Sequence, residues 1–273
     1  MATEDHPVQV SSSAEPDFHP DQRKLYQEVL RLLKARTVPF AVSGAFALQQ
    51  HTGIWRTTKD LDLFLTAETI PCALDLLRQE GLECEICDPV WLAKTRRSEY
   101  FVDLITGMSN AALKVTDSWI ERAKSAVVID VETKVLAAEE LLASKLFVVR
   151  RERFDGADIA HIVYGTRGEL DWDRIMELAG AHWEMLLSSL LLFRYAYPAQ
   201  SHYVPLAVWT DLLNRLTHGL RNPDPSARFR GSLVDENMFA IDMSEWGLDD
   251  LLSEYRARRI AEIQSPPYRS MAL

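Results

Sequence analysis

Two aspartates that stand two residues apart are the clearest chemical signal in this sequence. The stretch TTKDLDLFL, residues 57–65, places Asp60 and Asp62 among apolar residues that alternate as in a half-buried strand. Side chains two apart in a strand lie on the same face, so the two carboxylates are expected to be neighbours. Such a pair either raises a pKa or binds a cation, and its hard oxygen ligands suit Mg²⁺. On its own, the pair fits equally well with two solvent-facing side chains on an edge strand.

A serine–glycine turn lies upstream of the two aspartates. In VPFAVSGAFAL, Ser43 and Gly44 stand between a β-prone run and a helix-forming one. The first N–H groups of a helix and its dipole favour an anion, and a glycine lets a phosphate approach the backbone closely. The Ser43 hydroxyl adds a donor, so the turn is a candidate phosphate site, although many turns share this form.

A third acid, Asp103, lies in the β-prone run EYFVDLITG. A carboxylate on a strand beside Asp60 and Asp62 could complete a set of metal ligands and accept a proton from a substrate hydroxyl. Taken separately, an aspartate in this position is more often a strand-end or ion-paired residue. Because the turn, the paired acids and the third acid occur in this order, we interpret them as one set.

Together, these motifs resemble the nucleotidyltransferase superfamily with the DNA polymerase β type fold. Within it, the pattern R-x-T-x-D-L-D over residues 56–62 is similar to the small bacterial nucleotidyltransferases that include the AbiEii toxins. Relatives also carry a helix with a lysine and then a D-x-x-D step after an arginine-rich stretch, and the matching residues here are Lys145, Asp155 and Asp158. The resemblance covers roughly residues 37–165, and the last hundred or so lie outside it.

The resemblance implies roles for particular residues. Asp60 and Asp62 would bind two Mg²⁺ ions, and Asp103 would join one metal and act on the attacking hydroxyl. The NTP substrate would be held by a set of nucleotide-binding residues: Ser43, Gly44, Arg56, Thr58 and Lys145. The turn departs from the Gly-Gly or Gly-Ser form that is frequent among relatives.

The elements that must position these residues follow from periodicity. Helices are expected from Asp21 to about Arg36, over Ala45 to Gln50 with a stop at Gly53, and over ETIPCALDLLRQ before Gly81. VPFAV and DLDLFL predict strands, and two more, CEICDPVWLA and SEYFVDLITG, are expected on either side of a basic KTRR turn.

The expected fold class is α+β, with a nucleotidyltransferase-type mixed sheet flanked by helices and followed by a C-terminal helical region. We expect a disordered tail over residues 1–20, an α/β core over 21–134 and a helical domain over 135–273.

Composition indicates which binding partners and which cellular location to expect. The formal net charge of −10 disfavours broad binding to a phosphate backbone, although local basic runs remain. No run approaches the roughly 18 apolar residues that a membrane helix needs, and the N-terminus is acidic and polar, unlike a signal peptide. We therefore expect a cytoplasmic protein without a membrane partner. Two of the three cysteines form a CxxC, Cys84 and Cys87, which we interpret as ordinary thiols because no second ligand pair exists.

The sequence supports three functional hypotheses. The first is an Mg²⁺-dependent nucleotidyltransferase that moves a nucleoside monophosphate from an NTP, such as ATP, to a hydroxyl of an unidentified acceptor: tRNA, protein or a small molecule. The second is a catalytically silent binding module with the same fold, such as an antitoxin or scaffold. The third, metal-dependent phosphohydrolysis, would use similar ligands but would not need the serine–glycine turn.

Overall fold

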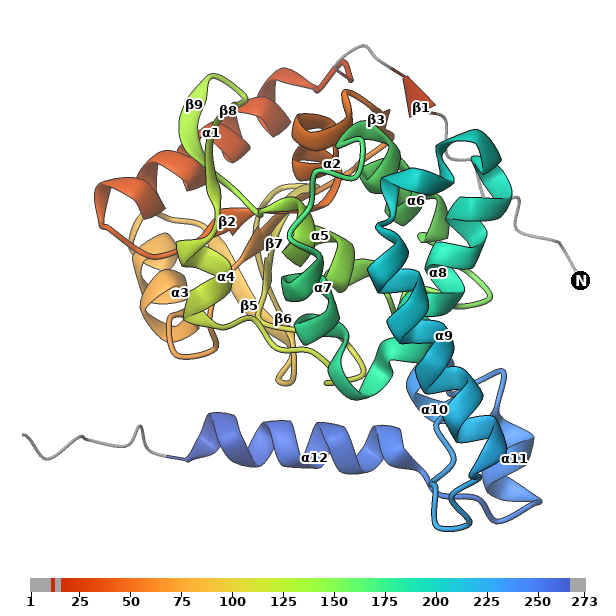
Figure 1. The fold of residues 1–273 in the computed structure, drawn as a ribbon. Helices are drawn as coiled ribbons and strands as arrows, with labels where there is room; N and C mark the ends of the chain where they lie inside the picture. Colours follow the sequence, from red (N-terminus) through yellow and green to blue (C-terminus); the bar gives the residue numbers. More distant parts are fainter. Residues whose placement is uncertain (1–10, 13–15, 266–273) are drawn as a thin grey trace, which may run out of the picture.

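The computed structural model describes residues 11–12 and 16–265. A mixed seven-stranded sheet with the order β5-β6-β7-β4-β2-β9-β8 forms the centre of the first half of the chain (Figure 1). Its strands are β2 (Ala41–Val42), β4 (Leu61–Phe64), β5 (Glu83–Asp88), β6 (Leu92–Arg97), β7 (Tyr100–Ile105), β8 (Lys124–Val128) and β9 (Val131–Val135). The expected α+β class with a mixed sheet is therefore confirmed.

The centre of the sheet determines where the acidic residues lie. β4 runs parallel to β7, and their register places Asp62 opposite Asp103. β2 pairs with β4 in the antiparallel sense, and the backbone N–H of Ser43 donates to the carbonyl of Asp62 at 2.8 Å. The three motifs from the sequence therefore meet at the end of β2 and the start of β4.

Helices α1 (Pro20–Ala35) and α3 (Ile70–Gln79) pack against each other and against the sheet. In α1, Leu25, Val29 and Leu33 recur at helical spacing and are buried. Helix α2 (Gly44–Thr52) ends at Gly53, as expected, in a left-handed conformation. It contacts β4 and β9 on one side and the later helices α5 and α6 on the other. The sheet and the helical half thus share one packed core.

Two neighbouring elements were predicted wrongly. The single strand expected over CEICDPVWLA is divided between β5 and β6 by a turn at residues 89–91. The basic KTRR segment was expected to be a turn, but it lies within strand β6, and the turn is the following pair, Ser98 and Glu99. The strand is revealed by its alternation, because Ala93 and Thr95 are buried while the intervening Lys94 is less so. Ser98 has a φ of 57°, which suits a tight hairpin turn.

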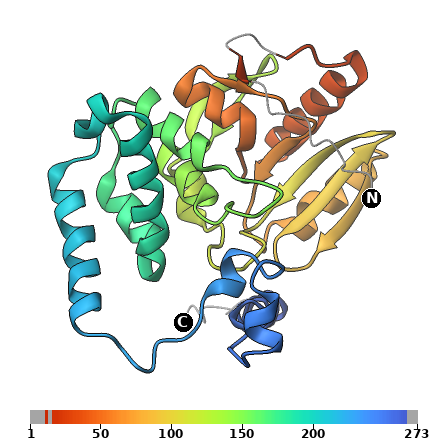
Figure 2. The same cartoon turned by 90° about the vertical axis from the view of Figure 1, so that its right-hand side faces the viewer.

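The second half of the chain is helical (Figure 2). Its elements are α5 (Ala138–Lys145), α6 (Gly156–Gly165), α7 (Trp172–Ala179), η1 (Gly180–His182), α8 (Trp183–Ala196), η2 (Pro198–Tyr203), α9 (Leu206–Arg221), α10 (Gly231–Val234), α11 (Ala240–Ser244) and α12 (Leu251–Gln264). All eight residues of α5 are buried, and its charged side chains are ion-paired. Oε1 of Glu140, for example, pairs with both Arg122 and Arg174.

Helix α12 returns to the sheet half at the end of the chain (Figure 1). Arg256 binds Asp88 at the end of β5 at 2.9 Å, and Lys114 binds Glu262 at 3.1 Å. The remaining short elements are α4 (Asp117–Glu121) and a separate pair of strands, β1 (Ser11–Ser12) and β3 (Trp55–Arg56). Of the tail expected over residues 1–20, residues 1–10 and 13–15 lie outside the described residues.

Within the described residues, the stretch Trp172–Ala196 is long and apolar enough to cross a membrane by length and composition alone. It comprises α7, η1 and α8. The side chains of Leu186, Leu190 and Phe193 in α8 are fully buried in the core. In this stretch 33% of the apolar window is buried, and a core helix of a folded domain meets the same criterion of length and composition.

Candidate active site

The three aspartates singled out in the sequence converge on one point. One carboxylate oxygen from each of Asp60, Asp62 and Asp103 lies within 4.8 Å of the others. The parallel register of β4 and β7 explains this arrangement, since Asp62 and Asp103 are directly opposed and Asp60 lies two residues before Asp62. Asp103 is buried, while the other two are half-buried. The sequence thus located a real spatial cluster.

The cluster has an unfavourable concentration of negative charge. Burial, together with the charges of Asp60 and Asp103, raises the pKa of Asp62 to about 7. Burial also raises the pKa of Asp103, although the nearby ammonium group of Lys94 opposes the effect. Three hard oxygen ligands in a poorly solvated place are a donor set that fits a divalent cation such as Mg²⁺. The residues present therefore fit the metal that the sequence predicts.

The serine–glycine turn is built around Asp62. Gly44 has a φ of 58°, a left-handed conformation that favours glycine. A Cβ at this position would overlap Oδ2 of Asp62 and lie 2.9 Å from its Cγ. The glycine is therefore required for the close approach of a protein carboxylate, which is an additional reason beyond the phosphate contact expected from the sequence. Ser43 is buried beside it, at the start of α2.

Thr58 and Arg56 make hydrogen bonds in the segment that leads into β4. The Thr58 hydroxyl donates to Oδ1 of Asp60 at 2.8 Å and to its carbonyl oxygen at 2.9 Å. Arg56 Nε donates to Oδ1 of Asp158 at 2.7 Å. These contacts fix the loop that precedes β4, and the expected nucleotide contacts of both residues stay predictions.

Lys145 lies at the centre of a buried ion-pair network. Its ammonium nitrogen is 2.8 Å from Asp155 and 2.8 Å from Asp158. Burial alone would lower the pKa of Lys145, but the two carboxylates raise it above the usual range. Arg153 binds Asp155 from the other side at 3.1 and 3.0 Å. The expected phosphate contact of Lys145 stays a prediction, and the contacts in the structure are with carboxylates.

Two side chains near the triad were missed in the sequence. Lys94, in the segment predicted as a turn, binds Asp103 at 2.8 Å. Its alternation with buried neighbours in β6 was the available signal. Tyr26 in α1 donates to the carbonyl of Lys59 at 3.1 Å and thereby holds the residue that precedes Asp60. Its position depends on the packing of α1 over the sheet, which local sequence does not reveal.

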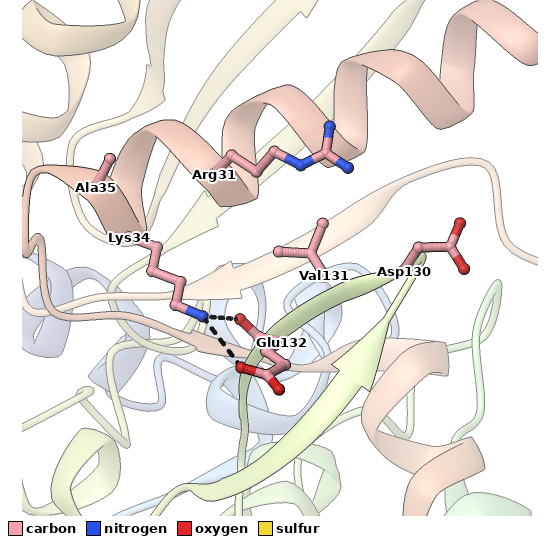
Figure 3. A pocket seen from close by; sticks show the side chains of 6 residues that line it. All are labelled: Arg31, Lys34, Ala35, Asp130, Val131 and Glu132. Atoms are coloured by element: carbon pink, nitrogen blue, oxygen red, sulfur yellow. Dashed lines mark hydrogen bonds and ion pairs between the residues drawn. The ribbon is translucent and has the colours of Figure 1, made fainter.

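The structure also has an open hollow away from the triad (Figure 3). It has a volume of about 570 Å³ and lies between α1 and the turn that joins β8 to β9. Its lining residues are Arg31, Lys34, Ala35, Asp130, Val131 and Glu132. Lys34 closes one side by donating to the carbonyl of Glu132 at 2.7 Å. The candidate chemistry is therefore concentrated at the triad and not in this hollow.

Comparisons with known proteins agree with the motifs. The family described as "Nucleotidyl transferase of unknown function" matches residues 22–188. A search among curated proteins finds no match.

Solved structures to which this chain is similar include the antibiotic-resistance factor ANT(2'')-Ia. The two chains are 16% identical with a TM-score of 0.39, and the match covers 67% of this chain and 96% of that one. The lincosamide antibiotic adenylyltransferase LnuA is 16% identical with a TM-score of 0.37, covering 51% and 94% of the two chains. An antigenic nucleotidyltransferase-like protein from Paracoccidioides brasiliensis is 16% identical with a TM-score of 0.42, and the match covers 72% of this chain and 96% of that one. The narrower resemblance to AbiEii-like enzymes stays a prediction.

Proposed function

Because the chain belongs to this family of nucleotidyl transferases, we propose that it transfers a nucleoside monophosphate from an NTP to a hydroxyl of an acceptor, with Mg²⁺. The observation that carries the proposal is the convergence of Asp60, Asp62 and Asp103 beside a glycine whose missing Cβ makes room for Asp62. Such an arrangement would be unfavourable without a cation, since burial and like charge both oppose ionisation of Asp62.

Asp60 and Asp62 are the proposed ligands of two Mg²⁺ ions, and Asp103 is the proposed further ligand of one. When bound, Mg²⁺ supplies Lewis-acid stabilisation of the oxygens of the transferred phosphoryl group. Thr58 orients Asp60 through its hydrogen bond, and Lys94 orients Asp103 through its ion pair. The protein's own contribution is thus to hold the carboxylates in place before the substrate arrives.

Asp103 is the proposed proton acceptor. The acceptor hydroxyl oxygen forms a bond to the α-phosphorus while the bond to the bridging oxygen of the β-phosphate breaks, which releases pyrophosphate. The hydroxyl proton passes to the Asp103 carboxylate, which the ion pair with Lys94 holds in place. Ser43 and Gly44 open helix α2, and the N–H groups and dipole at this end are the proposed binding site for the triphosphate.

The acceptor is proposed only as a hydroxyl-bearing molecule: tRNA, protein or a small molecule. The net charge of −10 favours an acceptor that needs a small contact area over one that needs an extended basic surface. A cytoplasmic location is proposed with it, since NTPs and Mg²⁺ are both abundant there.

The test is transfer of label from each of four α-labelled NTPs into the RNA, protein and small-molecule fractions of a cell lysate. Wild-type protein is compared with the double variant Asp60→Ala, Asp62→Ala. Asp75→Ala serves as the matched control, because this aspartate is exposed on α3 and pairs with Arg78. Label in one fraction with the wild type and the control, but not with the double variant, supports the proposal and identifies the acceptor class. Equal labelling by the double variant would exclude the proposed site, whereas no label in any fraction with the wild type would favour the catalytically silent binding module.

A further inference from the structure

A short arginine-rich loop joins α5 to α6 and contacts the ion-pair network of Lys145. The loop, residues 148–154, is closed at its base by a β-bridge between Val149 and Phe154 and by a 2.8 Å bond from Asp155 N–H to the carbonyl of Val148. It presents Arg153 beside the ion-pair network of Lys145. We refer to residues 148–154 as the arginine loop.

The tip of the arginine loop is held by residues that follow α10. Glu236 accepts a hydrogen bond from Arg150 at 3.2 Å, and the buried Asp235 accepts one from the backbone N–H of Arg151 at 3.1 Å. The loop is therefore fixed at its base by its own backbone and at its tip by the C-terminal region. The family match ends at residue 188, so this clamp comes from a part of the chain beyond it.

Among the described residues, three cations bind the two carboxylates of the ion-pair network. Its carboxylates are Asp155 and Asp158, and its cations are Lys145, Arg56 and Arg153. The side chains of Lys145 and Arg56 are 8% and 14% exposed, whereas that of Arg153 is 63% exposed. The cation of this network that faces solvent is therefore Arg153.

A chain of contacts joins the arginine loop to the segment that carries the triad. Arg153 binds Asp155, Lys145 lies 2.8 Å from both Asp155 and Asp158, and Asp158 accepts a hydrogen bond from Arg56 at 2.7 Å. Arg56 lies four residues before Asp60 in the sequence. The network therefore connects the exposed guanidinium group to the approach to β4.

We propose that Arg153 binds the β- and γ-phosphates of the NTP, and that Asp235 and Glu236 position it by clamping the arginine loop. The inference rests on the proposed function and deepens it. A guanidinium fork matches two phosphate oxygens geometrically, and it offers a charge-assisted contact that a triphosphate needs. Asp155 keeps its contact with Lys145 at 2.8 Å, so Arg153 can turn to a phosphate without leaving a buried carboxylate unpaired.

The test uses inorganic pyrophosphate with Mg²⁺, because this probe contains the phosphates in question and is independent of the preferred base. Its affinity is measured by titration calorimetry for the wild type, Arg153→Gln and Arg153→Lys. Arg151→Gln is the matched control, since Arg151 is an exposed arginine of the same loop whose backbone, and not its side chain, makes the clamp contact. The melting temperature and the affinity for Mn²⁺, as a divalent cation in place of Mg²⁺, are recorded for every variant to check that the fold and the metal site are intact.

We expect Arg153→Gln to weaken pyrophosphate binding about 10- to 100-fold, as for loss of a charge-assisted contact, with Mn²⁺ affinity unchanged. Arg153→Lys should lie between it and the wild type, and Arg151→Gln should stay within about threefold of the wild type. Equal affinity of Arg153→Gln and the wild type would overturn this inference and leave the proposed function standing. A wild type that binds no pyrophosphate in the presence of Mg²⁺ would overturn both.

The clamp is tested separately with Glu236→Ala and the conservative Glu236→Gln. If Glu236 positions the loop, the alanine variant should weaken pyrophosphate binding about threefold to tenfold, and glutamine, which keeps an oxygen for Arg150, should restore most of it. A merely structural residue would change the melting temperature and leave the pyrophosphate affinity unchanged, and that result would overturn the positioning role.

Discussion

The glycines at the two ends of α2 provide a controlled test of how the triad is built. Gly44 and Gly53 have φ values of 58° and 74°, so an alanine is strained in either position. That strain costs about 1–2 kcal/mol. At Gly53 no heavy atom lies within 4 Å of the added Cβ, whereas at Gly44 the Cβ would overlap Oδ2 of Asp62. The two substitutions thus share a backbone cost and differ in one contact.

The expected magnitudes follow from that contact. In Gly44→Ala the carboxylate of Asp62 must move by roughly 1.5 Å to reach the 3.4 Å of an ordinary contact, and a displacement of about 1 Å already costs about 100-fold in rate. Gly53→Ala should lose only the stability that the shared backbone strain costs, and its transfer rate should be unchanged. Gly44→Ala should therefore melt somewhat below Gly53→Ala because of the added overlap, and only Gly44→Ala should lose transfer activity.

The assay combines thermal melting with the initial rate of transfer from α-labelled NTP. The prediction requires that the difference in rate between the two variants exceed their difference in stability when both are expressed as free energies. A Gly44→Ala enzyme that transfers nucleotide within about threefold of Gly53→Ala would refute the argument that the missing Cβ makes room for a catalytic carboxylate.

Three further predictions concern the groups around the triad. Because the pKa of Asp62 is raised to about 7 in the folded state, its contribution to stability is fully present below about pH 4 and is lost as the pH rises to 7. The metal-free protein should therefore be less stable at pH 8 than at pH 5, by on the order of 2 kcal/mol after solvent screening, and Asp62→Asn should remove the difference in melting scans. Lys145→Met should lower the free energy of unfolding by about 3 kcal/mol, because two buried carboxylates lose a partner, whereas the exposed Lys34→Met should change it by under about 0.5 kcal/mol. Equal denaturation midpoints for these two lysine variants would contradict the role of the network. Thr58→Val should slow transfer about tenfold with a loss of stability near 1 kcal/mol, because Asp60 loses an orienting hydrogen bond; an unchanged rate would show that the bond is dispensable.

The acidic cluster could be anticipated from the sequence because its information is local. Two aspartates at strand spacing define their own shared face, and the third lies in an equally strand-like run. The helices were also predictable, since α1 repeats its apolar residues at helical spacing and α2 ends at Gly53.

Features that depend on distant partners could not be predicted in this way. The basic segment of β6 was interpreted as a turn because its charges resemble a loop, yet Lys94 occupies a strand position that pairs it with Asp103. The requirement for glycine at Gly44 comes from the side chain of Asp62, which approaches through the pairing of β2 with β4. The contacts of Lys145 depend on residues 10 and 13 positions further along the chain.

The chemical form of the released label tests the central claim most directly. With γ-labelled NTP, Mg²⁺ and the acceptor fraction, the wild type should release its label as pyrophosphate, in step with transfer of the α-label to the acceptor. Asp62→Asn should release neither product, since the carboxylate at the centre of the triad is lost. Release of the label as inorganic phosphate, or pyrophosphate release by Asp62→Asn at the wild-type rate, would contradict the assignment of this triad to nucleotidyl transfer.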